Sequence, residues 1–180
     1  MNEKVIHGII ADSSFYLCFL DDIEEPDCLL KIISVFDFYI PPIVAEEIRI
    51  SEREKLRDNQ KIVRIDNYID FGEILRPFLS QEIINKGEHE VIGLGYHFYQ
   101  INLKFYLIVD EDEARDFIRE NLPYLLQSLH GTVGLIGICH CHYNIFKKET
   151  TIDILERIDQ SKFRISKDML NKIKREVKTC

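Results

Sequence analysis

The chain has 180 residues and an ordinary composition, with 46% hydrophobic and 30% charged residues and no tryptophan. Such a length is most economically one domain with a real core, and no apolar run approaches the length that spans a bilayer. The net charge of -8 at pH 7 argues against a protein that coats nucleic acid through a generally basic surface. It does not exclude an enzyme that gathers carboxylates in one cleft and reaches an anionic substrate through a metal ion.

Cysteine usage and the N-terminal sequence both bear on where the protein works. The five cysteines include no C-x-x-C pair, and their odd number argues against a disulfide scaffold and fits a reducing compartment. The N-terminus lacks the basic stretch followed by an apolar one that is typical of a signal peptide. We therefore expect a cytoplasmic protein with no membrane association.

The first predicted strand ends at an acid. Residues 5–10 are apolar enough for a short buried strand, and from Phe15 the apolar spacing predicts a helix. In open α/β sheets ligands bind outside the carboxyl ends of strands, so Asp12 is well placed for chemistry. The alternative is that Asp12, Ser13 or Ser14 only caps the following helix, because these residue types accept hydrogen bonds from free backbone N–H groups.

Strands and helices alternate along the rest of the chain. Further strands are predicted at 36–40, 62–66 and 105–109, and residues 51–61 are a polar connector. Helices are predicted at 26–36, 43–48, within 68–84, after Gly87, from 114, from 131, at 152–158 and at 167–177. This order implies right-handed crossovers and a three-layer α/β/α sandwich with a mostly parallel sheet. We expect a single domain over residues 1–180, with C-terminal helices from about 152.

Four separate groups of acids fall at strand ends or helix starts, on what would be one rim of that sheet. They are Asp12, Glu46 with Glu47, Glu88 with Glu90, and Asp110 to Asp112. Acids are also common in the first turn of helices because the helix dipole favours them there, so each group alone has an ordinary interpretation. Their repetition on one rim is the argument for a site.

Carboxylates brought together raise one another's pKa unless a cation compensates them. Ligation by oxygen alone selects hard divalent ions, Mg²⁺ or Mn²⁺, over zinc. Such an ion polarises a phosphoryl oxygen and lowers the pKa of a bound water, and a neighbouring carboxylate can orient or deprotonate that water. The acids therefore point to metal-assisted hydrolysis of a phosphodiester.

Two other patterns have competing interpretations. The run 139–142, Cys-His-Cys-His, contains zinc-ligand residue types, but helix neighbours two apart diverge by roughly 200° and cannot converge on one ion. Cys18 or Cys28 would have to join them, so we interpret the run as ordinary helix residues. The basic residues between Lys147 and Lys178 either flank an RNA path or form a solvated helix face.

Five segments of the chain, in their order and separations, resemble those of VapC-like PIN-domain proteins. They are 9–14 (IIADSS), 44–48 (VAEEI), 87–92 (GEHEVI), 107–115 (LIVDEDEAR) and 130–134 (HGTVG), and 162–170 (KFRISKDML) resembles the tail of a largely uncharacterised prokaryotic PIN subfamily. The resemblance implies a PIN-like α/β/α fold and a Mg²⁺- or Mn²⁺-dependent ribonuclease acting on RNA. It also implies a homodimer and, often, the toxin of a toxin–antitoxin pair, with an antitoxin protein as partner.

The resemblance also implies roles for single residues. Asp12, Glu47, Glu90 and Asp110 match the four metal-binding, catalytic acids of the family, and Glu47 fits better than Glu46 because it directly precedes an aliphatic residue. Both glutamates of the Gly-Glu-x-Glu segment match the subfamily pattern. Glu90 is favoured because it directly precedes the apolar helix run, and Glu88 is kept as a candidate.

The acidic run after the predicted strand at 105–109 departs from the subfamily, which tends to have two adjacent aspartates there. Here the run is Asp110-Glu111-Asp112, so Asp112 is a further metal-ligand candidate. We expect Arg115, Ser13 and Thr132 to contact substrate. An alternative role for Arg115 is to hold the carboxylates in place. The departure and the long segment 51–84 are compatible with an altered or lost activity, so the alternative function is a catalytically weak RNA- or protein-binding module.

Overall fold

The computed structural model describes residues 8–65, 73–78 and 86–180 of the chain. Its centre is a five-stranded, all-parallel sheet with the strand order β3-β2-β1-β4-β5. The strands are β1 (Gly8–Ala11), β2 (Asp37–Ile40), β3 (Ile62–Arg64), β4 (Phe105–Ile108) and β5 (Leu129–His130). The α/β/α class and the parallel sheet predicted from the sequence are confirmed.

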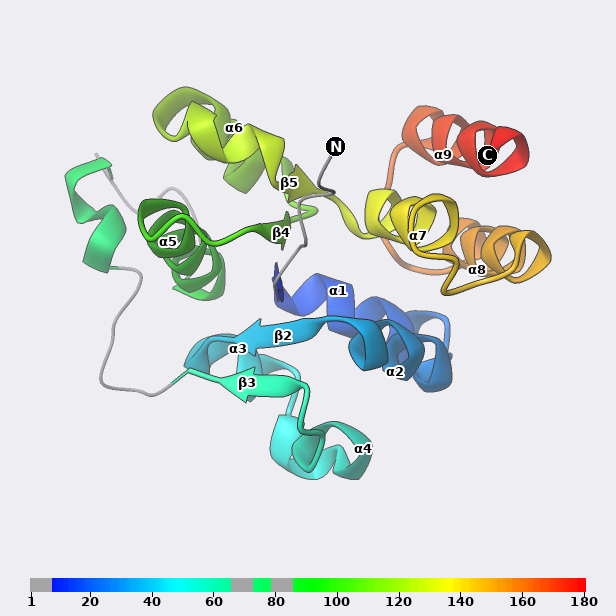
Figure 1. Ribbon diagram of the computed structural model, residues 1–180, viewed down its shortest axis with the longest axis horizontal. Coiled ribbons are helices and arrows are strands. Elements are labelled where there is room, and N and C mark those ends of the chain that lie inside the picture. Colours follow the sequence, from blue (N-terminus) through cyan, green and yellow to red (C-terminus); the bar gives the residue numbers. More distant parts are fainter. Residues whose placement is uncertain (1–7, 66–72, 79–85) are drawn as a thin grey trace.

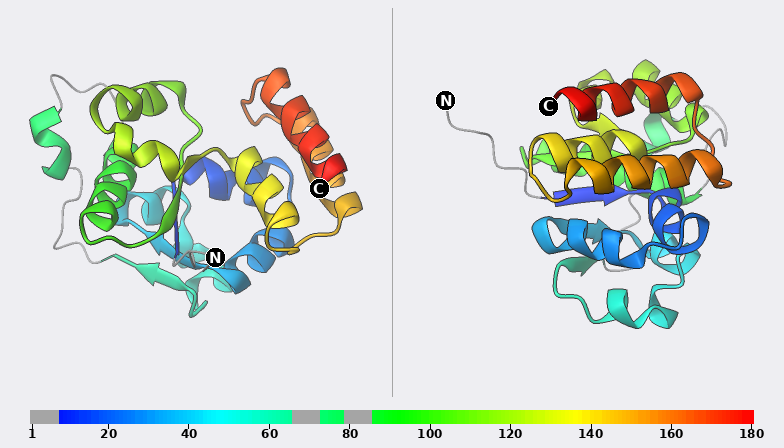
Figure 2. Two further views of the ribbon diagram at one scale, coloured as in Figure 1. Left: turned by 45° about the horizontal axis from the view of Figure 1, so that its top comes forward. Right: turned by 90° about the vertical axis from the view of Figure 1, so that its right-hand side faces the viewer.

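Helices cover both faces of the sheet, with α5 and α6 on one side and α1, α2 and α7 on the other (Figure 1). The α-helices are α1 (Ser13–Leu17), α2 (Pro26–Val35), α3 (Pro42–Glu47), α4 (Glu54–Arg57), α5 (Lys86–Gln100), α6 (Asp112–Asn121), α7 (Thr132–Cys141), α8 (Lys148–Gln160) and α9 (Lys167–Thr179). Short helical turns of other types lie at Cys18–Asp22, Ile50–Glu52, Glu73–Phe78 and Pro123–Gln127. The side view shows α7, α8 and α9 stacked beside one another in front of the sheet (Figure 2).

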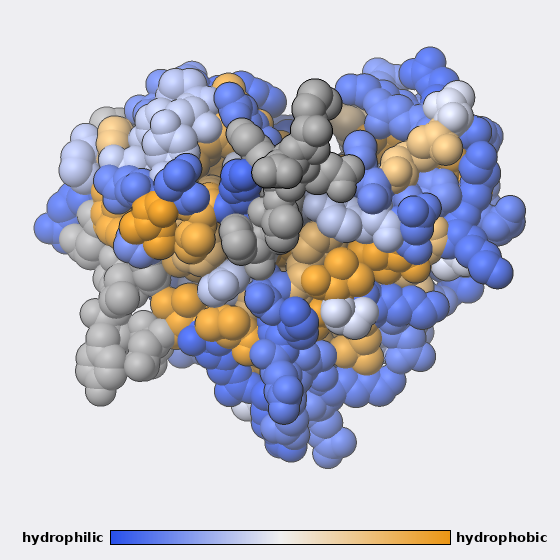
Figure 3. All heavy atoms as spheres, viewed as in Figure 1, coloured by the Kyte–Doolittle hydropathy of each residue, from blue (hydrophilic) through white to orange (hydrophobic). Residues whose placement is uncertain are grey.

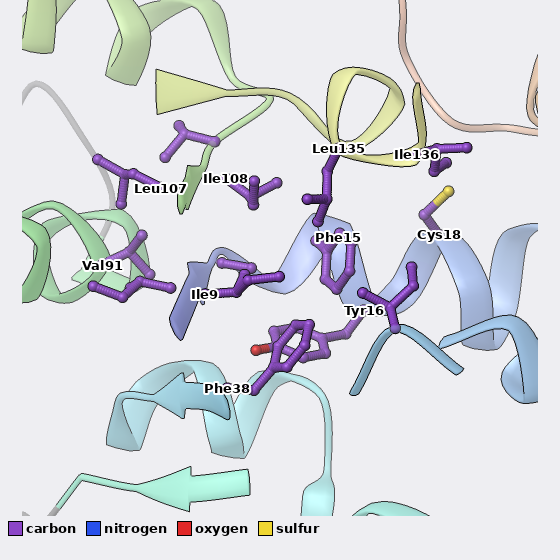
Figure 4. Close-up of a cluster of buried hydrophobic side chains, with 14 of the residues drawn as sticks. Ile9, Phe15, Tyr16, Cys18, Phe38, Val91, Leu107, Ile108, Leu135 and Ile136 are labelled. Atoms are coloured by element: carbon purple, nitrogen blue, oxygen red, sulfur yellow. The ribbon is translucent and has the colours of Figure 1, made fainter. Parts of the chain in front are cut away.

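The core forms because the central strands are apolar on both faces, as parallel strands covered by helices must be. β1 is buried throughout and β4 nearly so. Side chains from α1, β2 and α7 meet in one cluster (Figure 4), in which Phe15 stacks on Phe38 with ring centroids 5.8 Å apart. β1 and β4 themselves pair in parallel over their whole length, which places the residues that follow them side by side.

Away from the core, the surface is uneven in polarity. Hydrophilic side chains cover α4, whereas hydrophobic residues reach the surface over α5 and between α7 and α2 (Figure 3). Tyr99 and Ile101, at the end of α5, are about half exposed. No helix in the described parts of the chain has both the length and the apolar character to cross a membrane.

Several element boundaries differ from the predicted ones. α8 begins at Lys148 rather than near 152, because Lys147 takes the extended backbone of a helix-capping position and the polar first turn continues the helix. α6 begins at Asp112 rather than 114 for the same reason, with Glu111 extended before it. The first residues of the strand predicted at 5–10, the end of that at 62–66 and most of the helices predicted within 68–84 lie outside the described residues.

One disulfide is present among the described cysteines and joins Cys141, at the end of α7, to Cys180 after α9. Cys18, Cys28 and Cys139 are free and buried. A single bridge is not a disulfide scaffold. Its two cysteines are 39 residues apart in sequence, and only the packing of α9 against α7 brings them together.

Candidate metal centre

Two acids meet where β1 and β4 end side by side. The strands are in parallel register, with Ala11 opposite Ile108, so the residues that follow leave the sheet at the same edge. The backbone N–H of Asp12 donates to the Ile108 carbonyl at 3.0 Å, which carries the pairing one step further. The N–H of Asp110 then donates to Oδ2 of Asp12 at 3.2 Å. The two carboxylates are thereby set next to each other.

Asp12 caps the following helix with one carboxylate oxygen and faces Asp110 with the other. Its Oδ1 accepts a hydrogen bond from the N–H of Phe15 at 3.2 Å, so it is the N-cap of α1. Its Oδ2 faces Asp110 instead, and the side chain is only 3% exposed. The capping interpretation is confirmed, and it does not compete with a site because each oxygen has more than one lone pair.

Asp110 is held by the start of α7. Its Oδ1 accepts from the backbone N–H of Thr132 at 2.9 Å, and its Oδ2 accepts from the Thr132 hydroxyl at 2.5 Å. A Cβ on Gly131 would lie 2.8 Å from Asp110 Oδ1, so glycine is needed there for the close approach. Thr132 is fully buried, and its hydroxyl positions Asp110; its predicted contact with substrate stays a prediction.

Arg115 stands beside the same carboxylate. Its guanidinium donates to the carbonyl oxygen of Val109 at 2.7 Å, and its charge counteracts the upward shift in the pKa of Asp110. The side chain is half-buried, and its contacts are those of a residue that holds the strand end and the acid in place. Asp112, in the first turn of α6, is exposed, and Ser13, the first residue of α1, is half-buried.

Glu47 lies against the start of α5. A Cβ built on Gly87 would come within 2.9 and 3.0 Å of the two carboxylate oxygens of Glu47, so the glycine leaves the space that this carboxylate fills. Glu47 is the last residue of α3 and is exposed. The close approach brings this acid to the helix turn that carries Glu88 and Glu90.

Glu88 and Glu90 are both buried, at 7% and 6% exposure, but they face different neighbours. The charge of Glu88 is one of those that raise the pKa of Asp12. Glu90 uses Oε2 to accept a hydrogen bond from the backbone N–H of Ile43 at 2.9 Å, in the first turn of α3. Residues two apart on a helix point in different directions, which accounts for the difference.

The electrostatics of this edge favour a bound cation. Burial raises the pKa of Asp12 well above its usual value, and the charges of Asp110 and Glu88 raise it further. Burial also raises the pKa of Asp110. The hydrogen bonds from Phe15 and Thr132 oppose these shifts without cancelling them. Buried carboxylates whose charged form is disfavoured in this way are stabilised by a positive ion.

The buried hydroxyl of Tyr16, close to Asp12, was not predicted from the sequence. Its side chain is fully buried, and its hydroxyl has no hydrogen-bond partner among the described residues. Burial raises the Tyr16 pKa, and the charge of Asp12 raises it further, so the hydroxyl lies within electrostatic reach of Asp12. The available signal was the spacing, because Tyr16 follows Asp12 by four residues and so shares its side of α1.

Comparison with known proteins agrees with this geometry. A sequence model of a family described as PIN domain matches residues 8–179. The chain belongs to the PIN-domain family. No curated protein and no solved structure matches the chain significantly. The PIN domain is a nuclease-type fold, and PIN domains generally use divalent metal ions.

The residues of this PIN domain fit such an ion. The donors at the sheet edge are carboxylate oxygens, which hard divalent cations prefer. Burial raises the pKa of Asp12 and of Asp110 despite the charge of Arg115, so a further positive charge would stabilise their ionised forms. Gly87 makes room for a further carboxylate, that of Glu47, beside the turn that carries Glu88.

Proposed function

We propose that the protein is a metal-dependent ribonuclease that hydrolyses phosphodiester bonds of RNA. The observation that carries the proposal is the pair formed by Asp12 and Asp110 at the ends of adjacent strands: both carboxylates have raised pKa values, and the backbone N–H of Asp110 donates to the Asp12 carboxylate. A stability role alone does not account for such a pair, because burying like charges together is costly.

Mg²⁺ or Mn²⁺ is the ion we assign to this edge, with Asp12, Asp110, Glu88 and Glu47 as its protein ligands. When bound, the ion supplies a water of lowered pKa and polarises the phosphoryl oxygen. Glu88 stands ahead of Glu90 in this set because its charge acts on Asp12, whereas Glu90 anchors the first turn of α3.

The chain's own residues then have separate tasks. Asp12 and Asp110 hold their orientation through hydrogen bonds from Phe15 and Thr132. Glu47 is the exposed acid of the set, so we assign to it the orientation and deprotonation of the attacking water. Arg115 keeps the end of β4 in place through the Val109 carbonyl and offsets part of the negative charge.

Cleavage of a pool of single-stranded RNA oligonucleotides, with Mn²⁺ or Mg²⁺ supplied, tests the proposal. We expect cleavage by the parent protein, its loss in EDTA, and a fall on the order of 100-fold or more in Asp110→Asn. Asp112→Asn is the matched control, an exposed acid two residues away, and should cleave like the parent. RNA binding without cleavage in the parent would favour the binding-module alternative instead.

A second pair of variants tests which of the two buried glutamates, Glu88 or Glu90, is the metal ligand. Glu90→Gln keeps an oxygen that can accept from the Ile43 N–H, so cleavage should change little. Glu88→Gln removes a charge that acts on Asp12 and should reduce cleavage strongly. The reverse order of effects would assign the ligand to Glu90.

The biological setting belongs to the same proposal and is supported by resemblance to PIN-domain toxins. We assign the protein to the cytoplasm, as a homodimer whose activity an antitoxin protein restrains. Light scattering of the purified protein measures its oligomeric state. Co-expression with the products of neighbouring reading frames, followed by co-purification, tests for the antitoxin; the absence of any co-purifying product would remove the toxin role and leave the nuclease chemistry untouched.

A further inference from the structure

A second cluster of ligand-type side chains lies at the other end of α7. A ring nitrogen of His140 and the sulfur atoms of Cys141 and Cys180 all lie within 4.8 Å of one another. His140 and Cys141 are half-buried in the last turn of α7, and Cys180 is exposed after α9. Imidazole and thiolate together are the donors that select zinc.

Helix packing, and not the sulfur–sulfur bond alone, places Cys180 here. α9 buries Leu170, Ile173 and Val177, and it packs against α7 (Figure 1). A Cβ on Gly137 of α7 would lie 3.0 Å from the Ile173 side chain, so this glycine allows the two helices to approach closely. The Cα atoms of Cys141 and Cys180 are 5.6 Å apart. α9 therefore keeps Cys180 beside Cys141 when the disulfide is open.

The orientation of His140 is a second, independent observation. Its Nδ1 lies 2.9 Å from the carbonyl oxygen of Phe146. A carbonyl can only accept, so Nδ1 is the donor, and in the neutral ring Nε2 then has the lone pair that a metal ion needs. Histidines that bind metals are oriented in this way, with the second ring N–H donated to a carbonyl or carboxylate.

We propose that His140, Cys141 and Cys180 bind a zinc ion when the two cysteines are in the dithiol form, with water as the fourth ligand. The disulfide and the zinc site exclude each other, because the same two sulfur atoms form both. A dithiol reductant delivers two electrons and two protons to the disulfide and itself becomes a disulfide. Zinc binding then releases both thiol protons as the thiolates form.

This site is separate from the acidic one. α7 has ten residues, and at 1.5 Å per residue its two ends are roughly 15 Å apart. Thr132 at its start holds Asp110, whereas Cys141 is its last residue. Soft sulfur donors select zinc and oxygen donors select Mg²⁺ or Mn²⁺, so the two sites take different ions. The zinc site does not depend on the proposed nuclease function.

Metal retention by the full chain tests the proposal. The protein is reduced with a phosphine, incubated with Zn²⁺, desalted and analysed for metal, and Co²⁺ replaces zinc for absorption spectroscopy. We expect a single zinc per chain and the charge-transfer absorption that thiolates give with Co²⁺. Both should be lost in Cys141→Ser and Cys180→Ser, and zinc should bind at least about 10-fold more weakly in His140→Gln.

His142→Gln is the matched control, because this exposed histidine lies on the same stretch outside the cluster. Circular dichroism should show the same helix content for Cys180→Ser, whose side chain is exposed, as for the parent. Zinc retention in Cys180→Ser equal to that of the parent would overturn the proposal. So would zinc retention by the oxidised parent, or loss of the zinc in Asp110→Asn with Cys180 intact.

Discussion

The first residue of α7 contacts the carboxylate oxygens of Asp110. The last turn of α7 carries His140 and Cys141, which lie beside Cys180. At the first end, Thr132 holds Asp110, and Asp110 lies beside Asp12 because two neighbouring parallel strands end there. At the other end, Cys141 meets Cys180 only because α9 packs on α7. The first arrangement is fixed by sheet topology and the second by helix docking. The two ends should therefore respond to different changes.

The largest effect is expected where α7 holds the acid. Thr132→Val keeps the shape of the side chain and the backbone N–H but removes the hydroxyl that donates to Asp110 at 2.5 Å. We expect the Mn²⁺ affinity to fall about 10- to 100-fold, as when an outer hydrogen bond to a metal ligand is lost. Thr151→Val, which removes an equally buried hydroxyl from α8, should leave the affinity unchanged. Equal effects of the two variants would mean that general destabilisation is the cause.

Asp110→Asn should raise the stability of the metal-free protein although it lowers the activity. Burial raises the pKa of Asp12 and of Asp110 in the folded state. At pH values between the unfolded-state pKa and the folded-state pKa of each group, the folded protein therefore binds more protons than the unfolded chain. Its stability therefore falls as the pH rises through that window. Asp110→Asn removes one of the charges, and at neutral pH we expect it to raise the free energy of unfolding by on the order of 1 kcal/mol.

Urea unfolding at several pH values, in EDTA, measures this. Asparagine can still accept from the Thr132 N–H, so the main change is the loss of charge. As the pH rises above the ordinary aspartate pKa of about 4, the variant should lose less stability than the parent, because it has one raised aspartate pKa fewer. A variant that is less stable than the parent at neutral pH without metal would show that the acids are not under strain from burial.

A smaller effect is expected at Gly87. Gly87→Ala places a methyl group within about 3 Å of the Glu47 carboxylate, which is exposed and can move away. We expect the Mn²⁺ affinity to fall several-fold with little change in the melting temperature. Gly134→Ala is the matched control, because its methyl group would meet nothing closer than 3.9 Å. An unchanged affinity in Gly87→Ala would remove Glu47 from the ligand set.

The sequence predicts the acids near the start of α7 better than it predicts the histidine and cysteine cluster at its end. The apolar runs before Asp12 and Asp110 predict parallel strands, and strands of this kind bring the following residues to one edge of the sheet. Between the glutamates of one helix turn, the sequence pattern favours Glu90 over Glu88, whereas the contact of Glu90 with Ile43 appears only in the fold. The hydroxyl contact of Thr132 likewise depends on how α7 sits beside β4.

The cysteine cluster was beyond sequence reasoning for a related reason. The geometry of a single helix correctly shows that residues 139–142 cannot surround one ion, so a further ligand has to come from elsewhere in the chain. Cys18 and Cys28 are free, buried thiols and do not belong to the cluster. Cys180 takes the position because Gly137 lets α9 approach, a packing detail that no local pattern contains.

Calorimetric titration of Mn²⁺ into the oxidised, metal-free protein tests the central claim most directly, because the sulfur atoms are then joined and cannot bind metal. The account predicts binding by the parent and by Asp112→Asn, and its loss in Asp12→Asn and in Asp110→Asn. Absence of binding in the parent, or equal binding in Asp12→Asn, would contradict the account: the acids would then be caps and helix-start residues of a PIN domain without a metal centre.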